Sequence, residues 1–136
     1  MDALRMLELS AQGFHCAQII MIHALENDDN ENADLIRAVG GLNMGLYDFS
    51  GPCGALTGAC CMISYFAGKG EKDELEDPAL RDMISGFAAW FRQTYGSQTC
   101  IDILDGDAKN MPGRCPDIVQ ASYSKASELL DTNDVL

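Results

Sequence analysis

The chain has 136 residues, of which 47% are hydrophobic, and its 21 acidic against 9 basic residues give a formal charge of −12 at pH 7. We expect residues 1–136 to form a single helical, cysteine-rich domain, because this length suffices to build one substantial core. The negative charge argues against binding to nucleic acid or to an anionic membrane surface, and no apolar run approaches the roughly 20 residues that a membrane span needs.

Apolar residues recur at helical intervals through the first half of the chain. The pattern predicts helices over residues 3–11 and 14–27, and a short helix over residues 33–39. Residues 40–51, GGLNMGLYDFSG, lack the phosphate-binding glycine patterns and are expected to form a packed connector. The segment 52–67 is apolar almost all round, which is typical of a helix buried at the centre of a domain.

The second half begins with a charged loop and then a strongly amphipathic helix, predicted over residues 78–95 and ended by Gly96. A short helix follows, with Ser97 or Thr99 as its cap. After a loop, the last helix is predicted to start at Cys115, with Pro116 at its first helical position. The predicted fold class is therefore all-α, a bundle of five to seven helices around the central helix 52–67.

The central helix opens with the stretch SGPCGALTGACCMIS. Ser50 or Gly51 is expected to cap it, so that Cys53 falls in the first turn, where free N–H groups and the helix dipole favour a thiolate. Gly54 and Gly58 lie four residues apart on one face and leave room for another backbone. A redox or metal site and a buried helix of small residues are both open interpretations of this stretch.

Three further cysteines are predicted at the same kind of position as Cys53: Cys16, Cys100 and Cys115 each begin a helix. If the four helix starts converge, they form an electropositive pocket that suits thiolate ligands or cycling thiols. Cys60 and Cys61 are expected to be packing or auxiliary thiols. His15, next to Cys16, could tune that thiol, although one exposed and one hydrogen-bonded histidine is the simpler expectation for His15 and His23.

Six cysteines in a chain without a signal-peptide pattern indicate a cytoplasmic protein whose thiols bind metal or react, because a reducing compartment disfavours disulfides. Their spacing contains no CxxC and fits no zinc-finger, ferredoxin or haem-attachment pattern. The sequence also lacks the GxSxG and HExxH patterns of hydrolases.

The chain resembles a family of redox-active bacterial and archaeal proteins defined by four cysteines and a Cys-Gly-Ala-x-x-Gly motif. The matching residues are Cys16, the segment from Cys53 to Gly58, Cys100 in GSQTC and Cys115 in GRCPD. The resemblance implies a helical domain with a cysteine-based redox or iron–sulfur site. A related domain in dimeric split-Soret cytochromes also carries haem, which is not expected here because CxxCH is absent, and the pair Cys60-Cys61 is an addition.

Four function hypotheses follow. The first is an iron–sulfur protein for electron transfer or sensing, with Cys16, Cys53, Cys100 and Cys115 as ligands. The second is a metal-free thiol–disulfide protein in which Cys53 attacks. The third is a structural zinc or interaction module, and the fourth a helical domain with inert cysteines. The acidic surface fits a basic redox partner protein, and the high apolar fraction makes a homodimer plausible.

Overall fold

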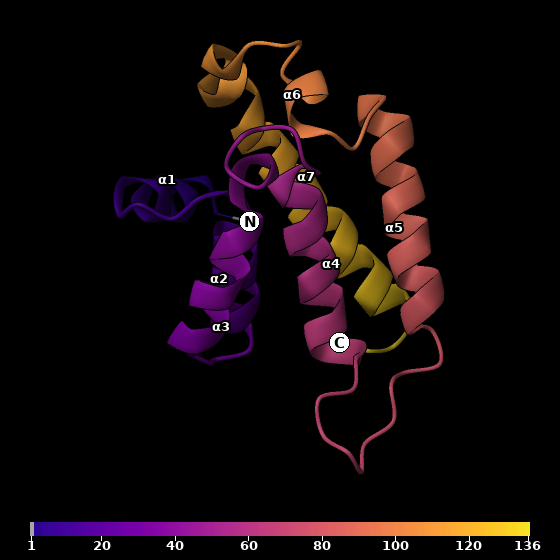
Figure 1. Ribbon diagram of the computed structural model, residues 1–136. Coiled ribbons are helices and arrows are strands. Elements are labelled where there is room, and N and C mark those ends of the chain that lie inside the picture. Colours follow the sequence, from indigo (N-terminus) through magenta and orange to yellow (C-terminus); the bar gives the residue numbers. More distant parts are fainter. Residues whose placement is uncertain (1) are drawn as a thin grey trace.

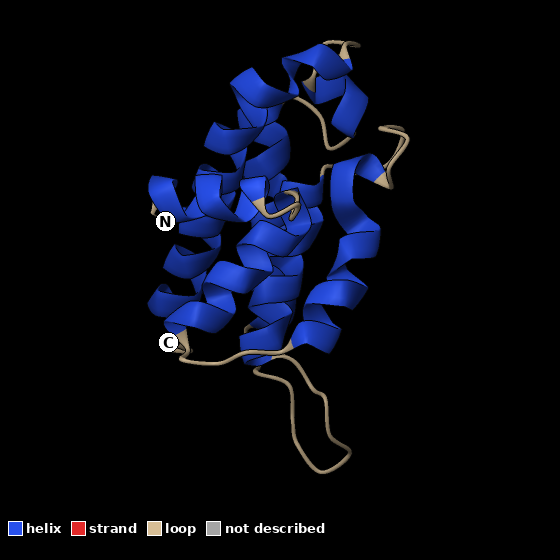
Figure 2. Ribbon diagram, turned by 90° about the vertical axis from the view of Figure 1, so that its left-hand side faces the viewer, coloured by secondary structure: helices blue, strands red, loops and turns tan. Residues whose placement is uncertain are grey.

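The computed structural model describes residues 2–136, which are helical apart from their loops and one isolated β-bridge between Pro52 and Thr99 (Figures 1 and 2). In this part of the chain there are seven α-helices and no strand, which confirms the all-α prediction. The elements are α1 (Ala3–Ala11), α2 (Cys16–Asn27), α3 (Ala33–Val39), the 3₁₀ helix η1 (Gly40–Gly45), α4 (Gly54–Ala67), α5 (Leu80–Tyr95), α6 (Cys100–Ile103), the 3₁₀ helix η2 (Ala108–Asn110) and α7 (Met111–Thr132).

Helix α4 is the centre of the bundle, as its sequence predicts. It packs against α2, α5 and α7, and Figure 1 shows it between α2 and α5. Phe87 and Phe91 of α5 are fully buried beside it in the same core, and each such aromatic side chain stabilises the fold by about 1.5–3 kcal/mol. The amphipathic stripe of residues 80–91 is what directs these rings inward.

Helices α2 and α4 approach each other closely through small residues. A Cβ added at Gly58 would lie 2.8 Å from Cα and 2.9 Å from the carbonyl oxygen of Ala17, so no side chain fits at position 58. Because Ala17 follows Cys16 directly, this contact also fixes where Cys16 sits relative to α4.

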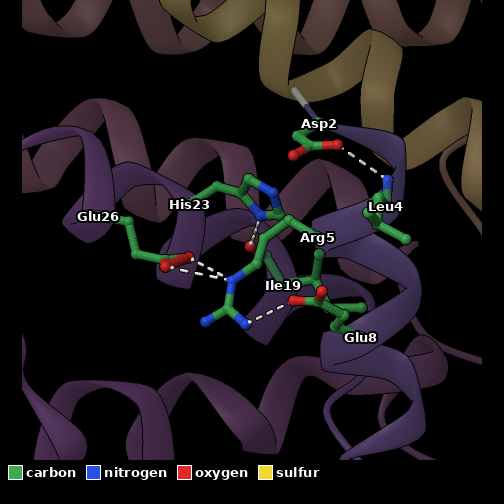
Figure 3. A network of polar contacts seen from close by, with 7 residues as sticks. All are labelled: Asp2, Leu4, Arg5, Glu8, Ile19, His23 and Glu26. Atoms are coloured by element: carbon green, nitrogen blue, oxygen red, sulfur yellow. Dashed lines mark hydrogen bonds and ion pairs between the residues drawn. The ribbon is translucent and has the colours of Figure 1, made fainter.

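Helix α1 is held against α2 by two buried side chains and by Arg5. Met6 and Leu9 enter the core, while the Arg5 guanidinium donates to Glu26 of α2 at 3.1 Å and to Glu8 at 3.2 Å (Figure 3). These exposed ion pairs contribute little stability, so the apolar contacts carry the attachment.

The start of α7 corrects the sequence prediction. The helix begins at Met111, not at Cys115, and Cys115 is its fifth residue. Pro112 occupies the first turn, where a missing N–H costs nothing, and Pro116 lies inside the helix, where it leaves the carbonyl of Pro112 without its usual donor. Only one backbone hydrogen bond is lost, near the N-terminus of α7, so the helix continues through Pro116.

The two ends of the bundle differ in construction. The loop 68–79 extends from the end where α4 leads into α5, as both views show. At the other end the chain is tied together by backbone hydrogen bonds: the Cys53 N–H donates to Gln98 O at 2.7 Å and the Cys100 N–H to Gly51 O at 2.9 Å. The starts of α4 and α6 therefore lie side by side.

Candidate functional site

A single cavity of about 260 Å³ has all four cysteines of the predicted site in its wall. The rest of the wall is mainly apolar and comes from α1, α2, α4, α7 and the connector after α3. The lining residues besides Cys16, Cys53, Cys100 and Cys115 are Met6, Leu7, Ser10, Phe14, His15, Ile19, Met44, Gly54, Ala55, Met111, Pro112, Pro116, Ile118 and Val119. Neither Cys60 nor Cys61 belongs to this lining.

Cys16 is the first residue of α2, and a buried polar network holds this helix start in place. Asn43, which is fully buried, accepts from the Ala17 N–H at 3.1 Å and donates to Gln18 Oε1 at 3.0 Å. Gln18 Oε1 also accepts from the His15 N–H at 3.3 Å. Asn43 thus satisfies the Ala17 N–H in addition to the capping interaction of His15 with Gln18, and nothing in the sequence pattern identified it.

The sulfur of Cys16 is enclosed by backbone. The Met44 N–H donates to Cys16 Sγ at an N···S distance of 3.5 Å. A Cβ added at Gly54 would lie 2.3 Å from the same sulfur, and one added at Gly45 would lie 2.5 Å from Cβ of Cys100. Glycine at positions 45 and 54 therefore lets the chain pass directly beside two of the cavity's cysteines.

Cys53 and Cys100 are buried, with 8% and 7% of their surfaces exposed. Cys100 is the first residue of α6, capped by Thr99, which is one of the two caps predicted. Cys53 is itself the N-cap of α4, so the prediction that Ser50 or Gly51 caps this helix is wrong. The reason is the β-bridge at Pro52, which keeps the chain extended until Cys53.

The chain from the end of η1 to the start of α4 has an unusual backbone. Met44, Leu46, Tyr47 and Phe49 have φ values of 51°, 65°, 70° and 66°, and Gly45 has 58°. Residues other than glycine rarely adopt this left-handed conformation, which costs about 1–3 kcal/mol each and clusters at functional sites. Here it is held by backbone hydrogen bonds, including Tyr47 N–H to Asn43 O at 3.0 Å and Ile101 N–H to Phe49 O at 2.9 Å.

Burial raises the pKa of all four cavity thiols, to about 12 for Cys53 and about 11 for Cys115. Negative charge on neighbouring cysteines raises the pKa of Cys53, Cys100 and Cys115 further. The helix-start N–H groups act in the predicted direction: those of Ala55 and Leu56 lower the pKa of Cys53. The predicted lowering of the Cys53 pKa is nevertheless wrong, because desolvation outweighs the helix N-terminus.

The cavity is also less cationic than the sequence suggested. No Lys or Arg occurs among the described lining residues, and His15 is the one side chain there that can carry positive charge. Within residues 2–136, no three His, Cys, Asp or Glu side chains lie close enough together to hold one metal ion. The electropositive character of the pocket is thus confined to backbone N–H groups at the helix starts.

The remaining candidate residues lie as follows. His15 is exposed and caps α2, whereas His23 is buried with Nδ1 at 2.9 Å from Ile19 O. Cys60 and Cys61 are half-buried in the interior of α4, and burial raises the pKa of Cys60 to about 11. All six cysteines are free thiols.

The family described as "Putative redox-active protein (C_GCAxxG_C_C)" matches residues 14–129, a range that contains all four cavity cysteines. The chain belongs to this family. At the motif, this redox-family member reads Cys53-Gly54-Ala55-Leu56-Thr57-Gly58. The structure explains both glycines, since Gly54 faces the Cys16 sulfur and Gly58 faces the backbone of Ala17.

No curated protein and no solved structure matches the chain significantly. Among the described residues, no helix combines the length and apolar character that crossing a membrane requires.

Proposed function

We propose that this protein is a cytoplasmic iron–sulfur protein that uses Cys16, Cys53, Cys100 and Cys115 as ligands for electron transfer or sensing. The observation that carries the proposal is the convergence of four thiols, from four separate segments, on one cavity. A thiol–disulfide reaction needs two cysteines, whereas four thiolates are the usual ligand set of an iron–sulfur cluster.

The chemistry of the donor set supports the cluster. The four cavity thiols repel one another's negative charge when they ionise, which favours the protonated forms in the metal-free protein. Cationic iron removes that repulsion and takes the place of the protons, so binding is coupled to proton release. The four thiols come from separate segments in the wall of one cavity, and no three of them among the described residues are close enough together to hold a single metal ion.

When bound, such a cluster accepts and releases one electron at a time. The chain's own contribution is to exclude water and to direct backbone N–H groups at the sulfurs, as the Met44 N–H does at Cys16. Such hydrogen bonds favour the reduced cluster and raise its potential. Gly45 and Gly54 are what allow the backbone to come this close.

The metal-free thiol–disulfide function fits this site less well. An attacking cysteine reacts as a thiolate, and Cys53 is buried with its pKa raised to about 12. The experiment must therefore distinguish three states of the protein: a bound iron–sulfur cluster, a metal-free thiol–disulfide pair and bound zinc.

The test is anaerobic purification followed by measurement of iron, acid-labile sulfide, zinc and visible absorbance. We expect brown protein with iron and sulfide in equal amounts, and colourless protein from each of the four single Cys→Ser variants. If the wild-type protein contains no iron and loses two titratable thiols on oxidation, the cluster proposal is wrong and the thiol–disulfide function takes its place. A homodimer stays a prediction. The molecular mass of the purified protein in solution tests it.

A further inference from the structure

Leu46 and Tyr47 form an apolar projection on the connector before α4. Their exposed fractions are 51% and 56%, and the two residues are adjacent in the chain. Their positions are fixed by the backbone: the left-handed segment is hydrogen-bonded, and Leu46 packs against Gly51, where an added Cβ would lie 2.7 Å from Cγ of Leu46. Two neighbouring apolar side chains are thus held outward at a strained turn.

This projection directly follows, in the chain, two residues that contact cavity cysteines. Leu46 and Tyr47 follow Met44, whose N–H contacts the Cys16 sulfur, and Gly45, which lies against Cys100. A protein docked on the projection would be separated from two of the four cysteines by one layer of backbone. Leu46 and Tyr47 do not line the cavity themselves, and of the other large exposed apolar side chains Leu7 lines it whereas Leu4 and Leu75 do not.

The charged residues next to the projection, in the chain or across its backbone hydrogen bonds, include two carboxylates. Asp48 is held beside it by the Ser50 N–H at 3.0 Å and Ser50 Oγ at 2.7 Å, and Asp102 follows Ile101, whose N–H is bonded to Phe49 O. Asp105 is neutralised by Arg114 at 2.6 Å. Between Arg37 and Lys69 the sequence has no basic residue, so the connector offers no cation of its own.

We propose that Leu46 and Tyr47, with Asp48 and Asp102 at their edge, form the docking surface for a one-electron carrier protein whose redox centre is framed by basic side chains. The apolar pair supplies the dry contact, and the carboxylates steer the basic partner. The electron-transfer step rests on the proposed function: the cluster is oxidised by one electron as the carrier is reduced by one, and no bond or proton changes place. The docking itself does not depend on the cluster.

The probe for this surface is cytochrome c, a basic one-electron haem protein, titrated at low ionic strength and followed by calorimetry. The apolar variant is L46N/Y47N, because asparagine tolerates the left-handed backbone and the substitutions should not unfold the connector. The charge variant is D48N/D102N. Matched controls are L4N/L75N for apolar surface, and E71Q/D73N, on the loop at the opposite end of the bundle, for charge.

We expect each surface variant to weaken cytochrome c binding about tenfold or more, and each control by less than about twofold. The rate of electron transfer from the reduced protein to ferricytochrome c should fall with the affinity, while the rate with the small oxidant ferricyanide stays unchanged. Equal weakening by surface and control variants would show that only net charge matters and would overturn the proposal, as would binding that none of the variants alters.

The same titration with metal-free protein separates this proposal from the proposed function. If the purified chain holds no cluster but L46N/Y47N still weakens cytochrome c binding, the docking surface stands and the cluster fails. If the cluster is present but the variants bind cytochrome c as the wild type does, the proposed function stands and the docking surface fails. Circular dichroism of each variant verifies that its fold is intact.

Discussion

Helix α4 carries cysteines in two environments that differ in what surrounds the sulfur. At its start, Cys53 lies in a cavity with thiols from three other segments and has the N–H groups of Ala55 and Leu56 nearby. Two turns later, Cys60 and Cys61 lie where the backbone N–H groups are already used within the helix. Burial raises the pKa in both places, so burial does not distinguish them. What distinguishes Cys53 is that three other segments bring thiols to the same cavity and that free N–H groups lie near its sulfur.

The largest effect separates the two groups directly. Cys53→Ser should abolish the visible absorbance and the bound iron, because three thiolates leave one ligand position of the proposed cluster open. The double variant C60S/C61S should keep both. Iron analysis and visible spectra of anaerobically purified proteins measure this, and loss of iron from the double variant would contradict the assignment of Cys60 and Cys61 outside the site.

Gly54→Ala should be the next most severe change. The new Cβ would lie 2.3 Å from the sulfur of Cys16, a proposed ligand, so we expect loss of bound iron and destabilisation of the metal-free protein by about 3 kcal/mol. Gly86→Ala in α5 is the matched control, because nothing lies within 4 Å of its Cβ and it is exposed. The control should stabilise by about 0.5–1 kcal/mol in urea unfolding, because alanine favours helix.

Asn43→Ala tests whether the buried cap positions Cys16. It leaves the Ala17 N–H without its acceptor, which should cost about 2 kcal/mol of unfolding free energy and shift the visible spectrum or the potential of the bound iron. Asn30→Ala removes an exposed hydrogen bond to Tyr65 and should cost less than about 1 kcal/mol. A destabilised Asn43→Ala protein with an unchanged spectrum and potential would make Asn43 structural only.

The smallest effect concerns the auxiliary thiol. The pKa of Cys60 is about 11 in the folded protein against 9.0 for an ordinary thiol, so between these values the unfolded chain ionises first. The contribution of Cys60 to stability is therefore complete below pH 9 and falls as the pH rises toward 11, by about 1 kcal/mol at pH 10, in addition to the fall that the raised pKa values of the cavity thiols cause. Urea unfolding of metal-free protein at pH 8 and pH 10 measures the fall, and Cys60→Ala should reduce it. An equal fall in both proteins would contradict this origin.

Most of the fold follows from the sequence because the helices bury continuous apolar stripes. The helices over residues 3–11 and 33–39 have the predicted bounds, and the central helix starts two residues later than predicted. The errors lie where local signals compete. Pro116 resembles a helix start, but Pro112 occupies the actual first turn, and Cys115 consequently lies one turn inside α7.

The surroundings of the site were harder to predict because they depend on contacts between distant segments. The four cysteines could be named from their placement and from the family resemblance, but Asn43 caps a helix that lies far from it in sequence. The left-handed residues from Met44 to Phe49 follow no residue preference, since only Gly45 among them is suited to that backbone. The prediction of a lowered pKa for Cys53 is wrong because a sequence does not reveal how deeply a helix start is buried.

The backbone tie at Pro52 and Thr99 has a practical consequence for engineering. It joins the start of α4 to the start of α6 through the main chain, at the end of the bundle that holds the cysteines. The loop 68–79 leaves the bundle at the opposite end (Figure 1) and can be lengthened or replaced by an affinity peptide without moving Cys53 relative to Cys100. Immobilised on an electrode through that loop, the protein would present its four-cysteine end to the solution.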